Sequence, residues 1–351
     1  MKRLFVAALV SLTSLHAEVT LREVSSRAFP SYFRMARHAF MRPSSRELWG
    51  LDRSIDLGTS QVLVELSKRY GCQHLRDLAF DASGNLVAFL QEDGGVAVWG
   101  VRDAKACFRQ ALSPAKFTTG AKSIGSCVTL SPDGRFVAVT GMGTLAQVWE
   151  IATGKECFRY AFPVIIDTWN EYNPELSKLA SFGLDFSPDG KFLAYGRLNK
   201  LTIIDGGAWV RKRDLPLPGT PVKITFLEPE ILVVQLRQAN SKTDGSDGAL
   251  SSRVGRVDLR TGEYRLAPES WTDYQTSPDG KNLILVAGGS KSLAVADSAS
   301  LAVLCEKRLS VAPQCIVFEG PSTFSVGLEN ASLVTYEIQN SKTVVDSIWG
   351  K

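Results

Sequence analysis

Short apolar runs separated by polar turns follow one another along most of the chain. The turn Ser-Pro-Asp-Gly lies between two such runs at 131–134, 187–190 and 277–280, and Asp-Ala-Ser-Gly stands in a similar place at 81–84. Proline sets φ at the first central position of a tight turn, aspartate tolerates the second, and glycine suits the position that often needs positive φ. Each turn with its two flanking runs therefore predicts a β-hairpin.

Two further runs follow each hairpin, and one such pair is written twice. Residues 98–112 read VWGVRDAKACFRQAL and residues 148–162 read VWEIATGKECFRYAF, with seven of fifteen positions identical. Each copy joins a third strand through a polar turn to a fourth strand. Four antiparallel strands in a repeat of about 40 to 50 residues are typical of one β-propeller blade. We interpret Trp149 and Cys157 of this phrase as packing residues of the blade rather than reactants.

The repeat predicts an all-β, seven-bladed β-propeller of four-stranded antiparallel blades, with six or eight blades as alternatives. The seven blades cover residues 35–74, 75–114, 124–163, 180–217, 221–268, 271–310 and 313–349. In the first blade we expect a hairpin at 39–51 and the third strand at 61–67. Residues 19–25 are expected to pair with the seventh blade and close the ring, since an unpaired edge exposes backbone donors and acceptors.

The repeats resemble those of bacterial WD40 proteins. In residues 148–156, VWEIATGKE, a third strand with Trp runs into Thr-Gly-Lys, and the SPDG turn is shared with related propellers such as the periplasmic YVTN type. The likeness extends over nearly all of the chain after its first residues. No Gly-His pair opens a blade, and Trp99-Gly100 and Trp149-Glu150 replace the Trp-Asp pair. The resemblance therefore implies the propeller fold and a role in protein interaction, and it implies no catalytic residues.

The N-terminus has the pattern of a secretory signal peptide. Lys2 and Arg3 precede an apolar run at 4–15, and Ala17 offers a small residue for cleavage. The run is too short to span a bilayer, although an uncleaved N-terminal anchor remains the alternative. We predict a signal peptide at 1–17, one propeller domain at 18–351, and an exported protein, periplasmic or secreted, of a bacterial cell envelope.

Charge and apolar runs narrow the range of partners. The formal net charge is +4, and cleavage of the leader leaves 38 basic against 36 acidic residues. Because nucleic-acid binding usually needs a basic stripe, we expect no nucleic-acid partner. No later stretch is long and apolar enough to cross a membrane, so we expect a mature chain without a membrane span, and a monomer.

The sequence carries no motif of a catalytic or cofactor site. No Gly-x-Ser-x-Gly elbow, P-loop or dinucleotide-binding fingerprint is present. His38 and His74 are the only histidines beyond the leader, which is a poor start for a metal site. The acidic stretch 243–248 lacks the spacing of a calcium loop. We therefore predict no catalytic residues, no metal and no cofactor.

The six cysteines occupy repeated positions. Four lie in fourth strands and two begin first strands; they are Cys72, Cys107, Cys157 and Cys305, and Cys127 and Cys315. Equivalent positions in adjacent blades are on the order of 15 Å apart, which exceeds the roughly 7 Å reach of a disulfide between Cα atoms. We interpret them as small hydrophobic residues. Bridges between Cys107 and Cys127, or between Cys305 and Cys315, remain open as alternatives.

Three segments are longer than the turns around them, namely 113–125, 163–181 and 237–253. Strand order predicts that all three lie on the same face of the propeller, where binding function usually collects. In 163–181, Asp167, Trp169, Glu171 and Tyr172 combine aromatic and acidic side chains, and we predict that they bind a protein or peptide partner. The alternative for Trp169 is that it folds back onto the fourth blade.

The two hypotheses for function differ in kind. The first is a non-enzymatic binding or scaffolding module that uses the face with the long segments. The second is a lactonase-like hydrolase with a metal in the central channel, for which Asp77 and Asp185, inside first strands, are the nearest candidates.

Overall fold

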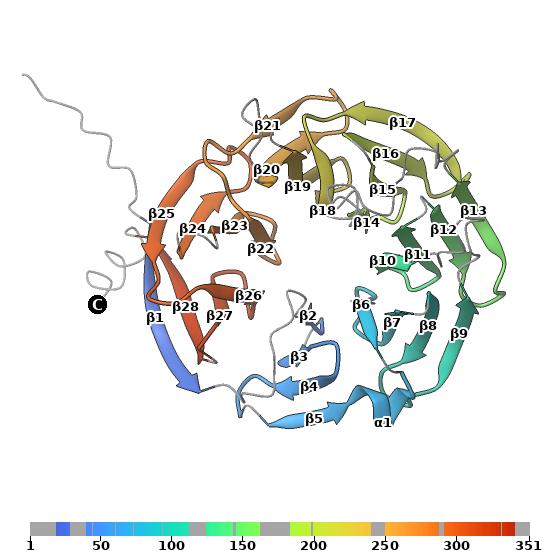
Figure 1. The fold of residues 1–351 in the computed structure, drawn as a ribbon, viewed down its shortest axis with the longest axis horizontal. Helices are drawn as coiled ribbons and strands as arrows, with labels where there is room; N and C mark the ends of the chain where they lie inside the picture. The colour runs from blue at the N-terminus through green and yellow to red at the C-terminus, as the bar shows by residue number, and fades with distance from the viewer. Residues whose placement is uncertain are drawn as a thin grey trace, which may run out of the picture.

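The structure, a computed structural model, describes thirteen stretches of the chain. They are residues 19–28, 40–43, 45–59, 61–72, 74–92, 94–111, 124–142, 145–161, 183–197, 199–239, 250–287, 291–330 and 332–340. Within these stretches, seven antiparallel sheets of four strands each stand around a common axis (Figure 1). The predicted seven-bladed β-propeller is confirmed, and the alternatives of six or eight blades are not.

Six blades are built from consecutive strands, with the first strand next to the axis and the fourth at the rim (Figure 1). Blade 1 consists of β2 (Phe40–Met41), β3 (Glu47–Trp49), β4 (Arg53–Asp56) and β5 (Val62–Glu65). Blade 2 consists of β6 (Leu75–Phe80), β7 (Leu86–Gln91), β8 (Gly95–Gly100) and β9 (Ala106–Ala111). Blade 3 consists of β10 (Ile124–Leu130), β11 (Phe136–Met142), β12 (Leu145–Glu150) and β13 (Glu156–Ala161).

The other four blades continue in the same sense around the ring. Blade 4 consists of β14 (Leu184–Phe186), β15 (Phe192–Arg197), β16 (Lys200–Asp205) and β17 (Val210–Pro216). Blade 5 consists of β18 (Thr220–Glu228), β19 (Ile231–Ala239), β20 (Leu250–Asp258) and β21 (Tyr264–Leu266). Blade 6 consists of β22 (Asp273–Thr276), β23 (Asn282–Ala287), β24 (Ser292–Asp297) and β25 (Val303–Arg308). Blade 7 consists of β26 (Pro313–Phe318), β27 (Thr323–Leu328), β28 (Ser332–Asn340) and β1 (Val19–Ala28).

The predicted closure of the ring by the N-terminal strand is confirmed. Strand β1 forms the outer edge of blade 7 and pairs with β28 from Val19 opposite Asn340 to Ala28 opposite Ser332. The last blade thus takes one strand from the start of the chain and three from its end. Because β1 covers the backbone edge of β28, the two ends of the described chain hold each other in place.

The SPDG turns form as predicted, and the serine explains why they recur. The hydroxyl of Ser131 donates to Asp133 at 2.6 Å and accepts the backbone N–H of Phe136 at 2.9 Å, while Gly134 has a φ of 70°. In the Asp-Ala-Ser-Gly turn the two roles are exchanged: Asp81 accepts the Leu86 N–H, and the Ser83 hydroxyl donates to Asp81. In either arrangement a side-chain oxygen of the turn accepts a backbone N–H at the start of the next strand.

The first blade corrects one prediction. Residues 61–67 were expected to form the third strand, but β5 within them is the fourth strand, and the third is the short β4. The turn between them is closed by Asp56, whose carboxylate accepts the Thr59 N–H at 2.7 Å. A five-residue helix, α1 (Leu66–Tyr70), follows β5 and ends at Gly71, which has a φ of 66°.

The core lies between neighbouring blades and includes the repeated tryptophans. Trp99 and Trp149 are 7% and 2% exposed, and each packs against an aromatic ring, Tyr70 and Phe108 respectively. This confirms Trp149 as a packing residue. All six cysteines are free, so neither alternative bridge is formed. Cys72 and Cys315 are buried as expected, whereas Cys107 is exposed and does not act as a core residue.

Candidate functional site

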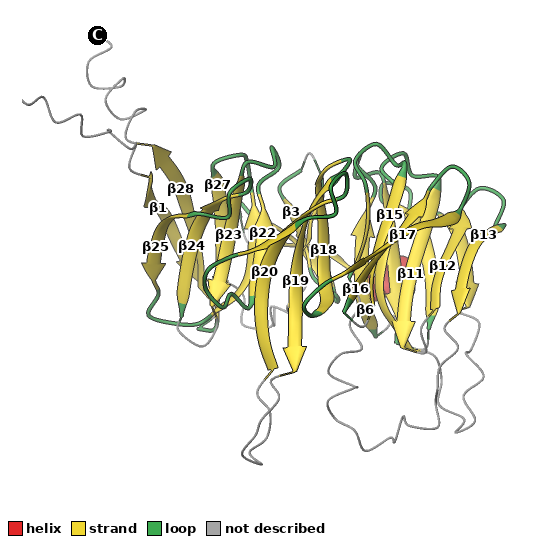
Figure 2. Cartoon of the chain, turned by 90° about the horizontal axis from the view of Figure 1, so that it is seen from above, coloured by secondary structure: helices red, strands yellow, loops and turns green. Residues whose placement is uncertain are grey.

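The two faces of the propeller differ in what they carry. The first and third strands of each blade end at one face, which bears the SPDG turns and is called the turn face. The second and fourth strands end at the opposite face, which bears the links between blades and is called the linker face (Figure 2). The three long segments named from the sequence correspond to the intervals from Ala111 to Ile124, from Ala161 to Leu184 and from Ala239 to Leu250; the interval from Ala28 to Phe40, between blades 7 and 1, is of similar length. All three leave and re-enter the blades at the linker face, as strand order predicted.

The residues predicted to bind a partner lie outside the described residues. Asp167, Trp169, Glu171 and Tyr172 fall between the end of β13 and Gly183, the next described residue. Their junctions with the blades are therefore placed on the linker face, between blades 3 and 4. Residues 243–248 and His38 also lie outside the described stretches, whereas His74 is exposed at the link between blades 1 and 2.

Asp77 and Asp185, the residues of the channel-metal hypothesis, each bind the backbone of the next blade. Asp77 Oδ2 accepts the Val128 N–H at 2.8 Å, and Asp185 Oδ2 accepts the Phe226 N–H at 2.9 Å. Burial raises the pKa of each carboxyl to about 7, against the lowering influence of these hydrogen bonds. In the part of the chain that the structure describes, no three His, Cys, Asp or Glu residues are grouped to hold a metal ion.

Side chains of the innermost strands connect several blades in this way. The thiol of Cys127 in β10 donates a hydrogen bond to Asp77, and burial raises its pKa well above the ordinary value. Between blades 5 and 6, Lys223 Nζ lies 2.8 Å from Asp273 Oδ1, and the Tyr274 hydroxyl donates to the Val233 carbonyl at 2.9 Å. These contacts join residues 41 to 50 positions apart.

The residues of these contacts between blades share one feature in the sequence. Asp77, Cys127 and Asp273 each stand four positions before the first residue of a hairpin turn. This spacing marks equivalent places in the repeat, but the hydrogen-bond partner belongs to another blade. The sequence pattern alone therefore did not reveal what these residues bind.

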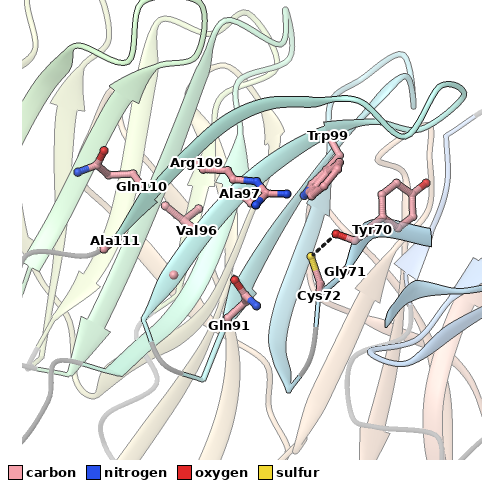
Figure 3. A pocket seen from close by; sticks show the side chains of 11 residues that line it. Tyr70, Gly71, Cys72, Gln91, Val96, Ala97, Trp99, Arg109, Gln110 and Ala111 are labelled. Atoms are coloured by element: carbon pink, nitrogen blue, oxygen red, sulfur yellow. Dashed lines mark hydrogen bonds between the residues drawn. The ribbon is translucent and has the colours of Figure 1, made fainter. Parts of the chain in front are cut away.

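A hollow of about 270 Å³ lies between blades 1 and 2, on the linker-face side of the rim (Figure 3). It is lined by Tyr70, Gly71, Cys72, Gln91, Gly95, Val96, Ala97, Trp99, Arg109, Gln110 and Ala111. The Arg109 side chain lies over the Trp99 ring, with its guanidinium carbon 4.6 Å from the ring centre. Burial raises the pKa of the Cys72 thiol, although the Arg109 charge opposes this. Sequence reasoning did not predict this hollow.

Seven four-stranded antiparallel blades, closed by the N-terminal strand, define a WD40-like β-propeller. The β-propeller domain of Cps50 (Swd1) from Myceliophteria thermophila has this fold, with a TM-score of 0.61 and 13% sequence identity over 91% of this chain and 100% of that one. At such low identity the likeness shows the fold alone. No protein-family model and no curated protein matches the sequence. None of the helices in the described stretches is long and apolar enough to cross a membrane.

Proposed function

We propose that this chain is an exported, non-enzymatic binding or scaffolding protein that holds a protein or peptide partner on its linker face. The observation that carries the proposal is that the segments 113–125, 163–181 and 237–253 all join the blades at that one face. The blades provide a rigid frame, and long connections on a rigid frame are where binding residues usually collect.

The composition of the segment between blades 3 and 4 supports this surface. Trp169 and Tyr172 combine a large apolar surface with hydrogen-bonding groups. Residues of these two types are enriched among those that contribute most of the binding energy of protein interfaces. Asp167 and Glu171 add negative charge, which favours a partner with a basic surface. The segment therefore combines an aromatic anchor with charges that set specificity.

Substitution of both aromatic residues tests the proposal. A partner captured from the native cell envelope and then purified should bind the Trp169→Ala/Tyr172→Ala variant about 30-fold more weakly or worse, because loss of even one aromatic anchor costs on the order of 2 kcal/mol. The measurement is isothermal titration calorimetry with the purified pair. The matched control is Tyr264→Ala, which removes an exposed aromatic side chain from β21 at the outer rim. Unchanged affinity of the double variant would show that the segment is not the binding surface.

Export is tested separately by the mass of the mature protein. Expression of the full chain in a bacterial host should give a protein in the periplasm or medium whose N-terminus is Glu18, because the leader ends at the small residue Ala17. Intact-mass spectrometry and N-terminal sequencing measure this. Recovery of the uncleaved chain in the cytoplasm, or anchored in the membrane, would contradict the prediction.

A further inference from the structure

The doubled phrase provides an internal comparison between blades 2 and 3. Arg109 in β9 lies opposite Ala97, and Arg159 in β13 lies opposite Gln147, so the two arginines occupy equivalent places. In blade 3 the Arg159 guanidinium donates to both carboxylate oxygens of Glu156, at 2.7 and 2.6 Å. The Gln147 amide nitrogen also lies 3.3 Å from Glu156 Oε2. Blade 3 therefore supplies the carboxylate that its own arginine binds.

Blade 2 lacks this carboxylate. Ala106 lies opposite Trp99 as Glu156 lies opposite Trp149, and Ala97 takes the place of Gln147. Two long polar side chains are thus replaced by methyl groups next to Arg109, and Ala97 and Arg109 line the hollow. Within the described stretches Arg109 stacks on Trp99 and has no carboxylate or carbonyl partner, and no acidic side chain lines the hollow.

A second donor at the same place has only a weak sulfur acceptor beside it. The indole nitrogen of Trp99 is buried and has no oxygen or nitrogen acceptor among the described residues. Figure 3 shows it on the side of Arg109 and of the Cys72 sulfur, which is only a weak acceptor. Gln91 also lines the hollow. A buried N–H without a strong acceptor is unfavourable, so an oxygen acceptor that enters the hollow is stabilised there.

We infer that the hollow between blades 1 and 2 is a binding site for the carboxylate of a ligand. The Arg109 guanidinium pairs with the carboxylate and the Trp99 N–H donates to it, which reproduces with an external group the ion pair that Glu156 makes inside blade 3. A volume of about 270 Å³ admits one carboxylate with a short apolar attachment against Tyr70 and Val96. The site goes beyond the proposed function, because it lies on the rim between other blades than those flanking 163–181.

Titration with hippurate, a small aromatic carboxylate, tests the site. The probe is followed through the indole N–H resonances of the mature protein labelled with nitrogen-15, in which the Trp99 resonance is assigned by its loss in Trp99→Phe. Sodium hippurate should shift the Trp99 resonance in a saturable way, and hippuramide, its neutral analogue, should not. An unmoved Trp99 resonance, or an equal response to hippuramide, would overturn the inference.

Three variants separate the site from general effects on folding. Arg109→Gln should weaken hippurate binding by about ten-fold or more, since it removes a charge-assisted pair. Ala106→Glu should abolish binding by supplying the in-blade carboxylate, and it adds an ion pair rather than removing one. Arg159→Gln is the matched control and should bind hippurate as the wild type does. Wild-type affinity in Arg109→Gln or in Ala106→Glu would refute the site.

Two peptides identify the source of the carboxylate. The probes are acetyl-Ala-Glu-Ala amide, which carries the acid on a side chain, and acetyl-Ala-Gly with a free C-terminus. Saturable shifts with either peptide assign the site to peptide ligands, and shifts with hippurate alone assign it to small acids; both results support a carboxylate site. The outcome is independent of partner binding by Trp169 and Tyr172, so failure of one proposal is distinguishable from failure of the other.

Discussion

Replacing Leu21 by Asp should lower the free energy of unfolding by about 3 kcal/mol or more. Leu21 lies in β1 opposite Ile338 and packs against the core between blades 6 and 7. Leu21 is partly buried, so an aspartate there places an unpaired charge against the apolar core, and it weakens the strand that closes the ring. Release of β1 leaves the edge of β28 uncovered, which also favours aggregation.

Val24→Asp is the matched control for this prediction. Val24 belongs to the same strand but lies at its register shift, and it is 54% exposed. The same new charge should change stability there by no more than about 0.5 kcal/mol. Urea denaturation followed by circular dichroism compares the two variants. Equal stability of both would mean that β1 does not hold the ring closed.

The free energy of unfolding should fall as pH rises from about 4 to about 7. Burial raises the pKa of Asp77 from 3.8 to about 7 in the folded state, while the unfolded chain has the ordinary value. In this window the folded protein keeps a proton that the unfolded chain has released, so rising pH favours unfolding. The slope is at most about 1.4 kcal/mol per pH unit for each such carboxyl. Above pH 7 both states are ionised and this contribution becomes constant.

Other groups shape the same pH profile. The Asp185 carboxyl has the same sign, but Asp185 retains partial exposure, so we expect a smaller contribution from it than from Asp77. Cys127, the hydrogen-bond partner of Asp77, keeps its proton throughout because its pKa is raised well above the ordinary value. Asp258, whose pKa the Arg260 side chain lowers to about 2, stabilises the fold above pH 4 and loses that effect only at lower pH. Its contribution to stability is therefore constant between pH 4 and 7 and adds no slope there.

Asp77→Asn isolates the buried carboxyl. An asparagine oxygen accepts the Val128 N–H as the carboxyl does, but the side chain cannot ionise. The variant should be more stable than the wild type at pH 8, and its stability should depend less on pH between 5 and 8. Asp205→Asn is the control, because its pKa is lowered and it titrates outside this window. Urea denaturation at several pH values measures the slopes, and an unchanged slope in Asp77→Asn would contradict the assignment.

Most of the architecture was predictable because each hairpin turn is formed by residues that are close together in the sequence. Ser131 and Asp133 build a turn within six residues, and the same group recurs wherever SPDG stands. The first blade was harder, since β4 is short and carries Arg53 and Asp56 at its ends. Because no clear apolar run marks β4, the sequence pattern predicts the following run, which contains β5, as the third strand. In the structure β5 is the fourth strand.

The candidate sites were less predictable than the fold. The direction of the strands was enough to assign the three long segments to one face. The roles of Asp77 and Asp185 were hidden, because each binds a backbone N–H in the following blade. The hollow beside Arg109 was not predictable either, although the two copies of the repeated phrase already differ at the position that leaves Arg109 without a carboxylate. Ala106 and Glu156 occupy the same place in two copies, but only the structure shows that Arg159 binds that glutamate.

The sequence by itself determined the hairpins and favoured seven blades with an N-terminal closing strand, because turn residues and alternating apolar runs act on neighbours along the chain. The structure decided between seven blades and the alternatives of six or eight. Tertiary structure decided which polar groups are buried together and where a repeat is left incomplete. Those properties depend on contacts such as Asp77 with Val128 and Tyr70 with Trp99, which exist only when separate blades pack side by side.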